Sequence, residues 1–229
     1  MGLNLESVDK SFGDPPIPVL KGISLNIDDG ELVSITGRSG SGKSTLLYVL
    51  STLDFATRGA VSLDGERVED LPAERLHRFR NQHMGFVFQA AYLLPELTVL
   101  ENVLMTAHKT GRQRELESRA RDLLGRVSLT ERLHYLPGRI SGGEKQRTVI
   151  ARSLIMNPKY IFADEPTGNL DSENGEVVLK IFHEINRDFK ATVVFVTHDK
   201  EFAARADRQI VIKDGRVAED RRTAAAGKS

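Results

Sequence analysis

A glycine-rich loop between a predicted strand and a predicted helix constrains the fold of this chain more than any other feature. The stretch GRSGSGKS at residues 37–44 places four residues between two glycines and follows the second glycine with Lys and Ser. Glycines at these positions let backbone N–H groups curl around phosphate oxygens, and the helix that follows adds its positive N-terminal end. A chance Gly/Ser turn would not need the β-branched run before the loop or the apolar run after it. The stretch is therefore predicted to be a phosphate-binding P-loop.

The side chains of this loop indicate how it would hold a nucleotide. Lys43 supplies a compact positive charge for the β- and γ-phosphates, and Ser44 offers its hydroxyl to Mg²⁺. Thr45 can reach another phosphate. The loop residues expected to contact the nucleotide are Gly37, Arg38, Ser39, Gly40, Ser41, Gly42, Lys43, Ser44 and Thr45.

A second segment, YIFADE at residues 160–165, places two carboxylates at the end of a predicted buried strand. Ligands of parallel sheets bind beyond the carboxyl ends of the strands. Neighbouring strand residues point to opposite sides, so the two acids can have different roles. Asp164 is expected to hold Mg²⁺ through water, and Glu165 to polarise the water that attacks the γ-phosphate. Two solvated acids at a strand end would be the preferred interpretation if the P-loop were absent.

Composition excludes some classes of function. Lys plus Arg and Asp plus Glu each number 32, so the formal net charge is zero and a nucleic-acid partner is not expected, although a local basic patch remains open. The absence of cysteine excludes disulfides, thiolate metal sites and cysteine nucleophiles. No apolar run approaches the ~18 residues that a membrane-spanning helix needs. Any action at a membrane is therefore expected to depend on a partner.

The two ends of the chain have strand patterns and the middle has a helical pattern. TVVFVT is typical of a buried parallel strand, and residues 173–188 are typical of a helix with one apolar face. The stretches AVSLDGERV and RQIVIKDGRVAED are typical of hairpins. The proline-rich stretch 13–22 is predicted to be a loop, and residues 73–157 to form several helices. These patterns predict an α/β core that carries an inserted α-helical subdomain.

The stretch ISGGEKQR at residues 140–147 is a second glycine-containing loop ahead of an apolar run. It resembles the signature motif of ATP-binding cassette (ABC) ATPases, usually written LSGGQ. Ile140 stands where Leu is common, and Glu144 where Gln is commoner. The remaining motifs of the family follow in order, with Gln89 in GFVFQ matching the Q-loop, Asp171 in GNLD the D-loop and His198 in VFVTHD the switch histidine. The resemblance extends to about residue 217.

The resemblance implies a fold and a set of roles. It implies a P-loop NTPase (RecA-like) core with an N-terminal antiparallel β subdomain and an inserted α-helical subdomain. One domain then spans residues 1–220, with the core at about 1–88 and 158–220 and the helical subdomain at about 89–157, followed by a disordered tail at 221–229. The implied catalytic residues are Glu165, His198, Lys43 and Gln89, and the implied ligands of Mg²⁺ are Ser44, Gln89 and Asp164. Phe12 matches an aromatic residue that stacks on the adenine of ATP; simple core packing of this ring is the alternative.

The resemblance also explains why one chain has two such loops. In ABC ATPases two subunits pack head to tail when ATP is bound, and the signature of each covers the nucleotide in the P-loop of the other. Ser141, Gly142, Gly143 and Glu144 are then expected at the nucleotide of the second subunit, as is Asp171. The implied ligands are ATP and Mg²⁺, and the implied assembly is a homodimer.

The stretch RNQHMGFVFQAAYLLPELTVLENV, with GEKQR and DEPTGNLD, resembles the lipoprotein-releasing and macrolide-exporting branch of the family. Members of this branch bind integral membrane permease subunits, so the resemblance implies a peripheral protein at the cytoplasmic face of the bacterial inner membrane. The residues after Gln89 would receive the coupling helix of the permease. The implied function is ATP hydrolysis that powers lipoprotein release. The alternatives are macrolide or peptide export and a cell-division type of signalling in which nothing is transported.

Overall fold

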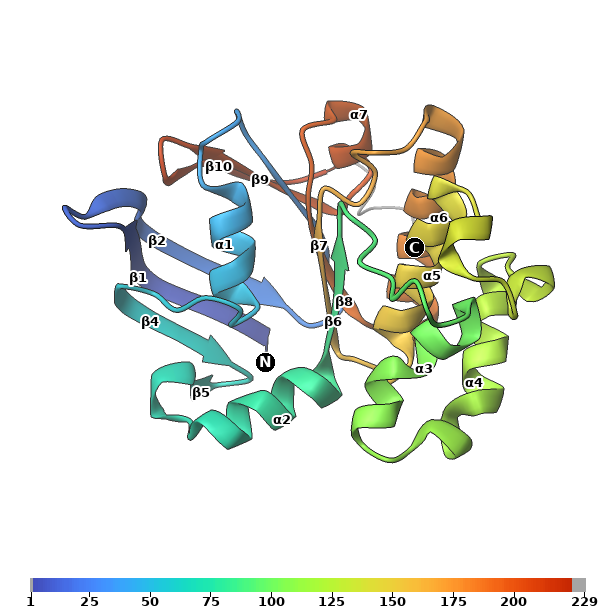
Figure 1. The fold of residues 1–229 in the computed structure, drawn as a ribbon. Helices are drawn as coiled ribbons and strands as arrows, with labels where there is room; N and C mark the ends of the chain where they lie inside the picture. The colour runs from blue at the N-terminus through green and yellow to red at the C-terminus, as the bar shows by residue number, and fades with distance from the viewer. Residues whose placement is uncertain (1, 224–229) are drawn as a thin grey trace.

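The strand patterns at the two ends of the chain form two sheets, shown as a ribbon in Figure 1. The computed structural model describes residues 2–223. The larger sheet has the order β10-β9-β3-β8-β7-β6, in which β10 alone is antiparallel to its neighbour. Its strands are β3 (Leu32–Thr36), β6 (Met84–Phe88), β7 (Tyr160–Asp164), β8 (Thr192–Val196), β9 (Arg208–Lys213) and β10 (Arg216–Arg222). Strands joined by helices on a mostly parallel sheet define the α/β class, so the predicted fold class is confirmed.

The smaller sheet is antiparallel and has the order β2-β1-β4-β5. Its strands are β1 (Gly2–Phe12), β2 (Ile17–Asp28), β4 (Arg58–Leu63) and β5 (Glu66–Arg67). The helices are α1 (Lys43–Leu50), α2 (Ala73–His83), α3 (Val99–Lys109), α4 (Gln113–Arg126), α5 (Gly142–Leu154), α6 (Ser172–Phe189) and α7 (Lys200–Ala203). Short 3₁₀ turns lie at Val68–Asp70, Thr130–Arg132 and Pro137–Arg139.

Alternate residues of the parallel strands face two separate hydrophobic cores. In β7, Phe162 joins a core with α1 and the antiparallel sheet, whereas Ile161 joins a core with α3, α4, α5 and α6. The alternation follows from the two-residue period of a strand. As a result α1 and α5 lie on opposite sides of the large sheet, which Figure 1 shows with α1 in blue and α5 in yellow.

The helices α3, α4 and α5 pack on one another through the second of these cores. All three fall within residues 89–157, the segment expected to be the helical subdomain. The domain boundaries themselves stay a prediction. Within residues 2–223 no helix has the length and apolar character needed to cross a bilayer.

Three local predictions differ from the structure. β6 was expected to be part of a helical region, but it is a parallel strand that pairs with β7. It follows α2 directly at Met84, with no turn residue to mark the change. Gly85 within it has no room for a Cβ beside the Ser153 carbonyl, so the strand packs closely on α5.

Residues 17–22, expected to be part of a loop, belong to β2, where Pro18 pairs with Ser11. A strand accommodates proline at the edge of a sheet, and β2 is an edge strand. The disordered tail was predicted to begin too early, because Arg221 and Arg222 pair with Gln209 and Arg208 in the β9–β10 hairpin. Charged side chains are typical of such an edge strand. Residues 224–229 lie outside the described residues.

Candidate nucleotide site

Four neighbouring strands of the large sheet end at one edge, and each end carries a predicted site residue. The strand order β3-β8-β7-β6 places these ends side by side. β3 leads into the P-loop, β8 into His198, β7 into Asp164 and Glu165, and β6 into Gln89. This edge holds the carboxyl ends of parallel strands, where ligands of α/β sheets bind.

The P-loop joins β3 to α1, with residues 38–40 exposed and residues 41–43 buried. Gly42 has φ +102° and occupies the N-cap of α1, a conformation that side-chain-bearing residues rarely adopt. Lys43 is buried and its Nζ donates to the Arg38 carbonyl at 3.2 Å, so the ammonium group lies back across the loop. The Ser41 hydroxyl is buried and has no hydrogen-bond partner among the described residues. A buried polar group without a partner fits a loop that binds an oxygen-rich ligand.

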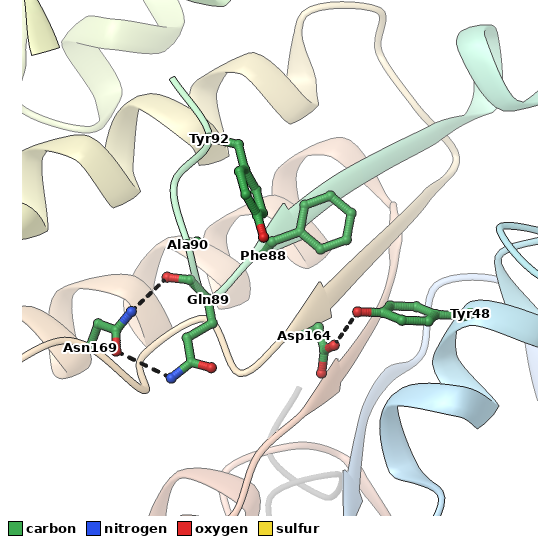
Figure 2. A pocket seen from close by; sticks show the side chains of 7 residues that line it. All are labelled: Tyr48, Phe88, Gln89, Ala90, Tyr92, Asp164 and Asn169. Carbon is green, nitrogen blue, oxygen red and sulfur yellow. Dashed lines mark hydrogen bonds between the residues drawn. The ribbon is translucent and has the colours of Figure 1, made fainter. Parts of the chain in front are cut away.

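Asp164 lies on the side of β7 that faces α1. It follows Tyr160 and Phe162 in the two-residue period, and both of these belong to the core with α1. Its Oδ1 accepts from the Ser44 hydroxyl at 2.8 Å and its Oδ2 from the Tyr48 hydroxyl at 2.7 Å; Figure 2 shows the second bond. Burial, reinforced by the bond to Asp164 and by its charge, raises the pKa of Tyr48 to about 12. The phenol is therefore protonated at neutral pH and donates.

Glu165 points to a different partner. Its backbone has φ +47°, in the left-handed region, and its N–H donates to the Val196 carbonyl at 3.1 Å. Its Oε2 lies 2.8 Å from Nδ1 of His198. The structure thus separates the two adjacent carboxylates, one toward the Ser44 hydroxyl and the other toward His198.

Gln89 and Asn169 bond to each other and line a cavity of about 380 Å³. Gln89 Nε2 donates to Asn169 Oδ1, and Asn169 Nδ2 donates to the Gln89 carbonyl, both at 3.2 Å (Figure 2). Tyr48, Phe88, Tyr92 and Asp164 line the same cavity. This cavity, which we name the nucleotide cavity, therefore connects the Q-loop candidate with the aspartate.

Phe12 lies at the end of β1, in the antiparallel sheet. Its side chain is 45% exposed and does not join either core, so core packing is not what this ring does. Nζ of Lys10 lies 4.7 Å from the centre of the ring, and the same ammonium pairs with Asp54 at 2.5 Å. A cation over one face leaves the other face of the ring for a base.

The signature stretch begins α5 with a capping box. The Ser141 hydroxyl accepts from the Glu144 N–H at 3.2 Å, and Glu144 Oε2 accepts from the Ser141 N–H at 2.7 Å. Arg132 Nε adds an ion pair to Glu144 at 2.9 Å. The Ser141 backbone bond, followed by the bond from Arg132, lowers the pKa of Glu144 below its ordinary value. This helix start lies on the opposite side of the large sheet from α1, so the structure does not bring Ser141, Gly142 and Gly143 to the P-loop of the same chain.

Asp171 caps the start of α6 and shares its partner with the signature stretch. Its Oδ1 accepts from the Asn174 N–H at 2.8 Å, which together with the Asn174 side chain lowers the pKa of Asp171. Asn174 Oδ1 accepts from Arg147 at 3.1 Å, and the same amide fills the space where a Cβ of Gly143 would lie. Asn174 therefore links the D-loop candidate to the signature stretch by direct contacts.

Sequence reasoning did not identify Tyr48, Asn169 or Asn174. Tyr48 is four residues after Ser44, so helical spacing puts both on one face of α1 and could have indicated it. Asn174 is three residues after Asp171, the spacing of an N-cap contact. Asn169 has no such local signal, since its partner is 80 residues away.

The side chains around Asp164 fit Mg²⁺. Hydroxyl, carboxylate and amide oxygens are the donors that this ion prefers, and Ser44, Asp164 and Gln89 supply one of each. In the part of the chain that the structure describes, no three His, Asp or Glu residues gather into a metal cage. That is expected for an ion that keeps several waters and binds through substrate phosphates.

Comparison with known proteins places this fold and site in a class. The family model described as ABC transporter matches residues 20–168, which is more than half of the chain. The chain therefore belongs to the ABC transporter family, as an ATP-hydrolysing cassette.

Two curated relatives indicate the branch. The lipoprotein-releasing system ATP-binding protein LolD of Leptospira interrogans is 50% identical over 94% of this chain and 90% of its own length. The macrolide export ATP-binding/permease protein MacB of Shigella flexneri is 47% identical over 94% of this chain but only 34% of its own length. The resemblance to this branch is confirmed.

Two solved structures of the ABC transporter cassette MJ0796 have the same fold. A dimeric structure is 40% identical, with a TM-score of 0.87 over 96% of this chain and 98% of the other. A dimeric post-hydrolysis state bound to ADP and Pi is 38% identical, with a TM-score of 0.85 over the same fractions.

Proposed function

We propose that this chain is the ATP-hydrolysing subunit of a bacterial complex that releases lipoproteins, and that it works at the cytoplasmic face of the inner membrane with integral permease subunits. One observation carries the proposal. The strand ends gather the residues for binding and hydrolysis at one edge, while the signature helix lies on the other side of the sheet. Such a chain needs a second subunit to complete each site. Similarity to LolD over nearly the whole chain supports lipoproteins as the cargo.

The residues at this edge of the sheet have different roles in ATP hydrolysis. The P-loop N–H groups and Lys43 bind the phosphates of ATP, with Ser44, Asp164 and Gln89 as the residues that hold Mg²⁺. The ion, when bound, neutralises charge on the β- and γ-phosphate oxygens. Glu165 orients and polarises the attacking water. His198, 2.8 Å from that carboxylate, holds Glu165 in place and offers its other ring nitrogen to the γ-phosphate.

The second subunit supplies the rest of the site. We propose a head-to-tail homodimer, formed when ATP binds, in which Ser141, Gly142 and Gly143 of each subunit reach the γ-phosphate held by the other. A helix start offers free N–H groups and a positive dipole end to such a group. The contact between Gly143 and Asn174 links this surface to Asp171. The dimeric state of the MJ0796 structures supports a dimer.

A groove beside the nucleotide cavity is the proposed docking site for the coupling helix of the permease. It has a volume of about 490 Å³, shares Phe88 and Tyr92 with the nucleotide cavity and lies along α2, β6, α3 and α5. Arg80 and Arg152 line it and donate to backbone carbonyls of Thr52 and Tyr92, and no carboxylate is among its lining residues within 2–223. An amphipathic helix with an acidic residue fits this combination of an apolar wall and two guanidinium groups that, within residues 2–223, have no carboxylate partner.

Lipoprotein release is tested by depletion of the protein in its native host, followed by separation of inner and outer membranes. We expect outer-membrane lipoproteins to accumulate in the inner membrane, and wild-type protein but not a Glu165→Gln variant to restore their transfer. Tagged Glu165→Gln protein, purified with ATP from detergent extracts, should retain a permease subunit. Normal lipoprotein transfer on depletion would contradict the proposed cargo. Increased macrolide sensitivity in its place would favour the export function that the similarity to MacB supports.

A further inference from the structure

The hydroxyl of Tyr48 forms a hydrogen bond with one of the two carboxylate oxygens of Asp164. Its hydroxyl donates to Oδ2 at 2.7 Å, while the Ser44 hydroxyl donates to Oδ1 at 2.8 Å (Figure 2 shows the tyrosine bond). Both donors come from the same face of α1, one turn apart. The carboxylate is therefore held in one orientation before any ligand binds.

The position of Tyr48 is itself fixed by the backbone around it. The carbonyl of Tyr48 accepts from the N–H groups of Leu53 and Asp54 at 2.9 and 3.1 Å, which anchors the end of α1. Its side chain is half-buried and lines the nucleotide cavity together with Phe88 and Tyr92. The anchored backbone and the packed ring place the hydroxyl beside Asp164.

We propose that Tyr48 is a positioning residue for the metal site: its hydroxyl occupies Oδ2 of Asp164, so that only Oδ1, which the Ser44 hydroxyl also contacts, would be open to a water of Mg²⁺. Mg²⁺ dehydrates reluctantly and keeps several waters, so one open carboxylate oxygen would be enough to hold it through water, whereas larger Ca²⁺ readily accepts both oxygens of a carboxylate directly. A hydroxyl that occupies Oδ2 therefore favours Mg²⁺ over Ca²⁺. The inference rests on the proposed role of Asp164 in holding Mg²⁺.

The structure provides a matched control at the other end of the same strand. Tyr160 is fully buried and its hydroxyl bonds to Asp64 at 2.8 Å and to Asp29 at 3.3 Å, so it makes the same kind of tyrosine–carboxylate contact at the other end of β7 from Asp164. Tyr160→Phe removes a tyrosine–aspartate bond without touching the nucleotide site. Tyr48→Phe removes one oxygen atom and keeps the ring that packs in the cavity.

The test measures metal-dependent nucleotide binding rather than turnover. Purified protein with Glu165→Gln, alone or with Tyr48→Phe or Tyr160→Phe, is titrated with Mg²⁺ and separately with Ca²⁺ in the presence of a fluorescent ATP analogue. Loss of a partner of a metal-binding side chain typically costs 10–100-fold in metal affinity. We expect Tyr48→Phe to raise the half-saturating Mg²⁺ concentration at least tenfold and to raise the half-saturating Ca²⁺ concentration by a smaller factor. Tyr160→Phe should leave both concentrations unchanged.

The possible outcomes separate the two levels of the proposal. If the half-saturating Mg²⁺ concentration and the half-saturating Ca²⁺ concentration are each the same with and without Tyr48→Phe, the proposed role of Tyr48 is overturned. Equal shifts in Tyr48→Phe and Tyr160→Phe, with matching losses of thermal stability, would also overturn it, because that pattern indicates general destabilisation. If nucleotide binding by the protein with Glu165→Gln alone does not depend on the Mg²⁺ concentration, the metal site of the proposed function is contradicted instead.

Discussion

His198 Nδ1 lies 2.8 Å from Glu165 Oε2 and thereby joins the ends of two neighbouring strands, β7 and β8. The two side chains differ in exposure, at 72% for the histidine and 18% for the glutamate. The glutamate is therefore held within the site, while the imidazole stays open to a nucleotide. We therefore expect His198 to hold Glu165 in place and also to contact phosphate.

Replacement of His198 by Ala is expected to lower kcat for ATP by about 100-fold or more, the size typical for loss of a proton-transfer or positioning group. ATP binding should change far less, since the P-loop is untouched. Steady-state turnover and binding of a fluorescent ATP analogue measure the two effects. A variant that retains the wild-type kcat would contradict the role of His198.

The two glycines of the signature stretch offer a paired test of the dimer. No atom lies within 4 Å of a Cβ added to Gly142, whereas one added to Gly143 meets the Asn174 amide. Gly143→Ala should therefore lower the free energy of unfolding by about 1–2 kcal/mol, because it displaces a hydrogen-bonded side chain. Gly142→Ala should leave thermal unfolding of the monomer unchanged.

Gly142→Ala should nevertheless weaken the ATP-dependent dimer, because the added methyl group stands between the helix start and the partner's phosphate. Size-exclusion chromatography of the Glu165→Gln protein with ATP, with and without Gly142→Ala, measures this effect. A normal dimer in the Gly142→Ala variant would show that this face does not meet nucleotide.

Glu144 makes the stability of α5 depend on pH. Its folded pKa lies below the ordinary value of 4.5, chiefly because of the Ser141 N–H bond, so its contribution is present above the unfolded pKa and is lost as the pH falls through the folded pKa. Glu144→Gln keeps a side chain that can complete the capping box but carries no charge for Arg132. The wild type should thus be the more stable at pH 7, and the difference should shrink below about pH 4.5. Urea unfolding across this range measures it, and a constant difference would exclude the charge of Glu144 as the cause.

Phe12 is expected to bind the base of ATP with the face that Lys10 leaves free. Stacking of a base on an aromatic side chain is worth about 1–3 kcal/mol, so Phe12→Ala should weaken ATP binding roughly tenfold. Phe12→Tyr should keep the affinity, since the ring remains. Calorimetric titration with ATP distinguishes these variants, and unchanged affinity of Phe12→Ala would exclude the stacking role.

Local patterns were sufficient for some parts of the molecule and not for others. The loop after β3, the strand β7 and the helix α6 were each predicted from residues adjacent in sequence. The structure confirms the predicted loop, strand and helix. β6 was missed because a five-residue strand that follows a helix without a turn has too few residues to show a period. The Tyr48–Asp164 bond joins residues 116 apart and depends on how α1 packs on β7. Helical spacing places Tyr48 on the same face of α1 as Ser44, but it does not indicate which strand that face meets.

The placement of α1 and α5 on opposite sides of the large sheet has a genetic consequence. With head-to-tail pairing, each composite site takes its P-loop from one chain and its signature from the other. A chain with Lys43→Ala and a chain with Ser141→Arg are then both inactive as homodimers. When both are produced in one cell, the mixed dimer contains one site built entirely from intact halves. Two recessive alleles of the same gene should therefore complement each other in trans.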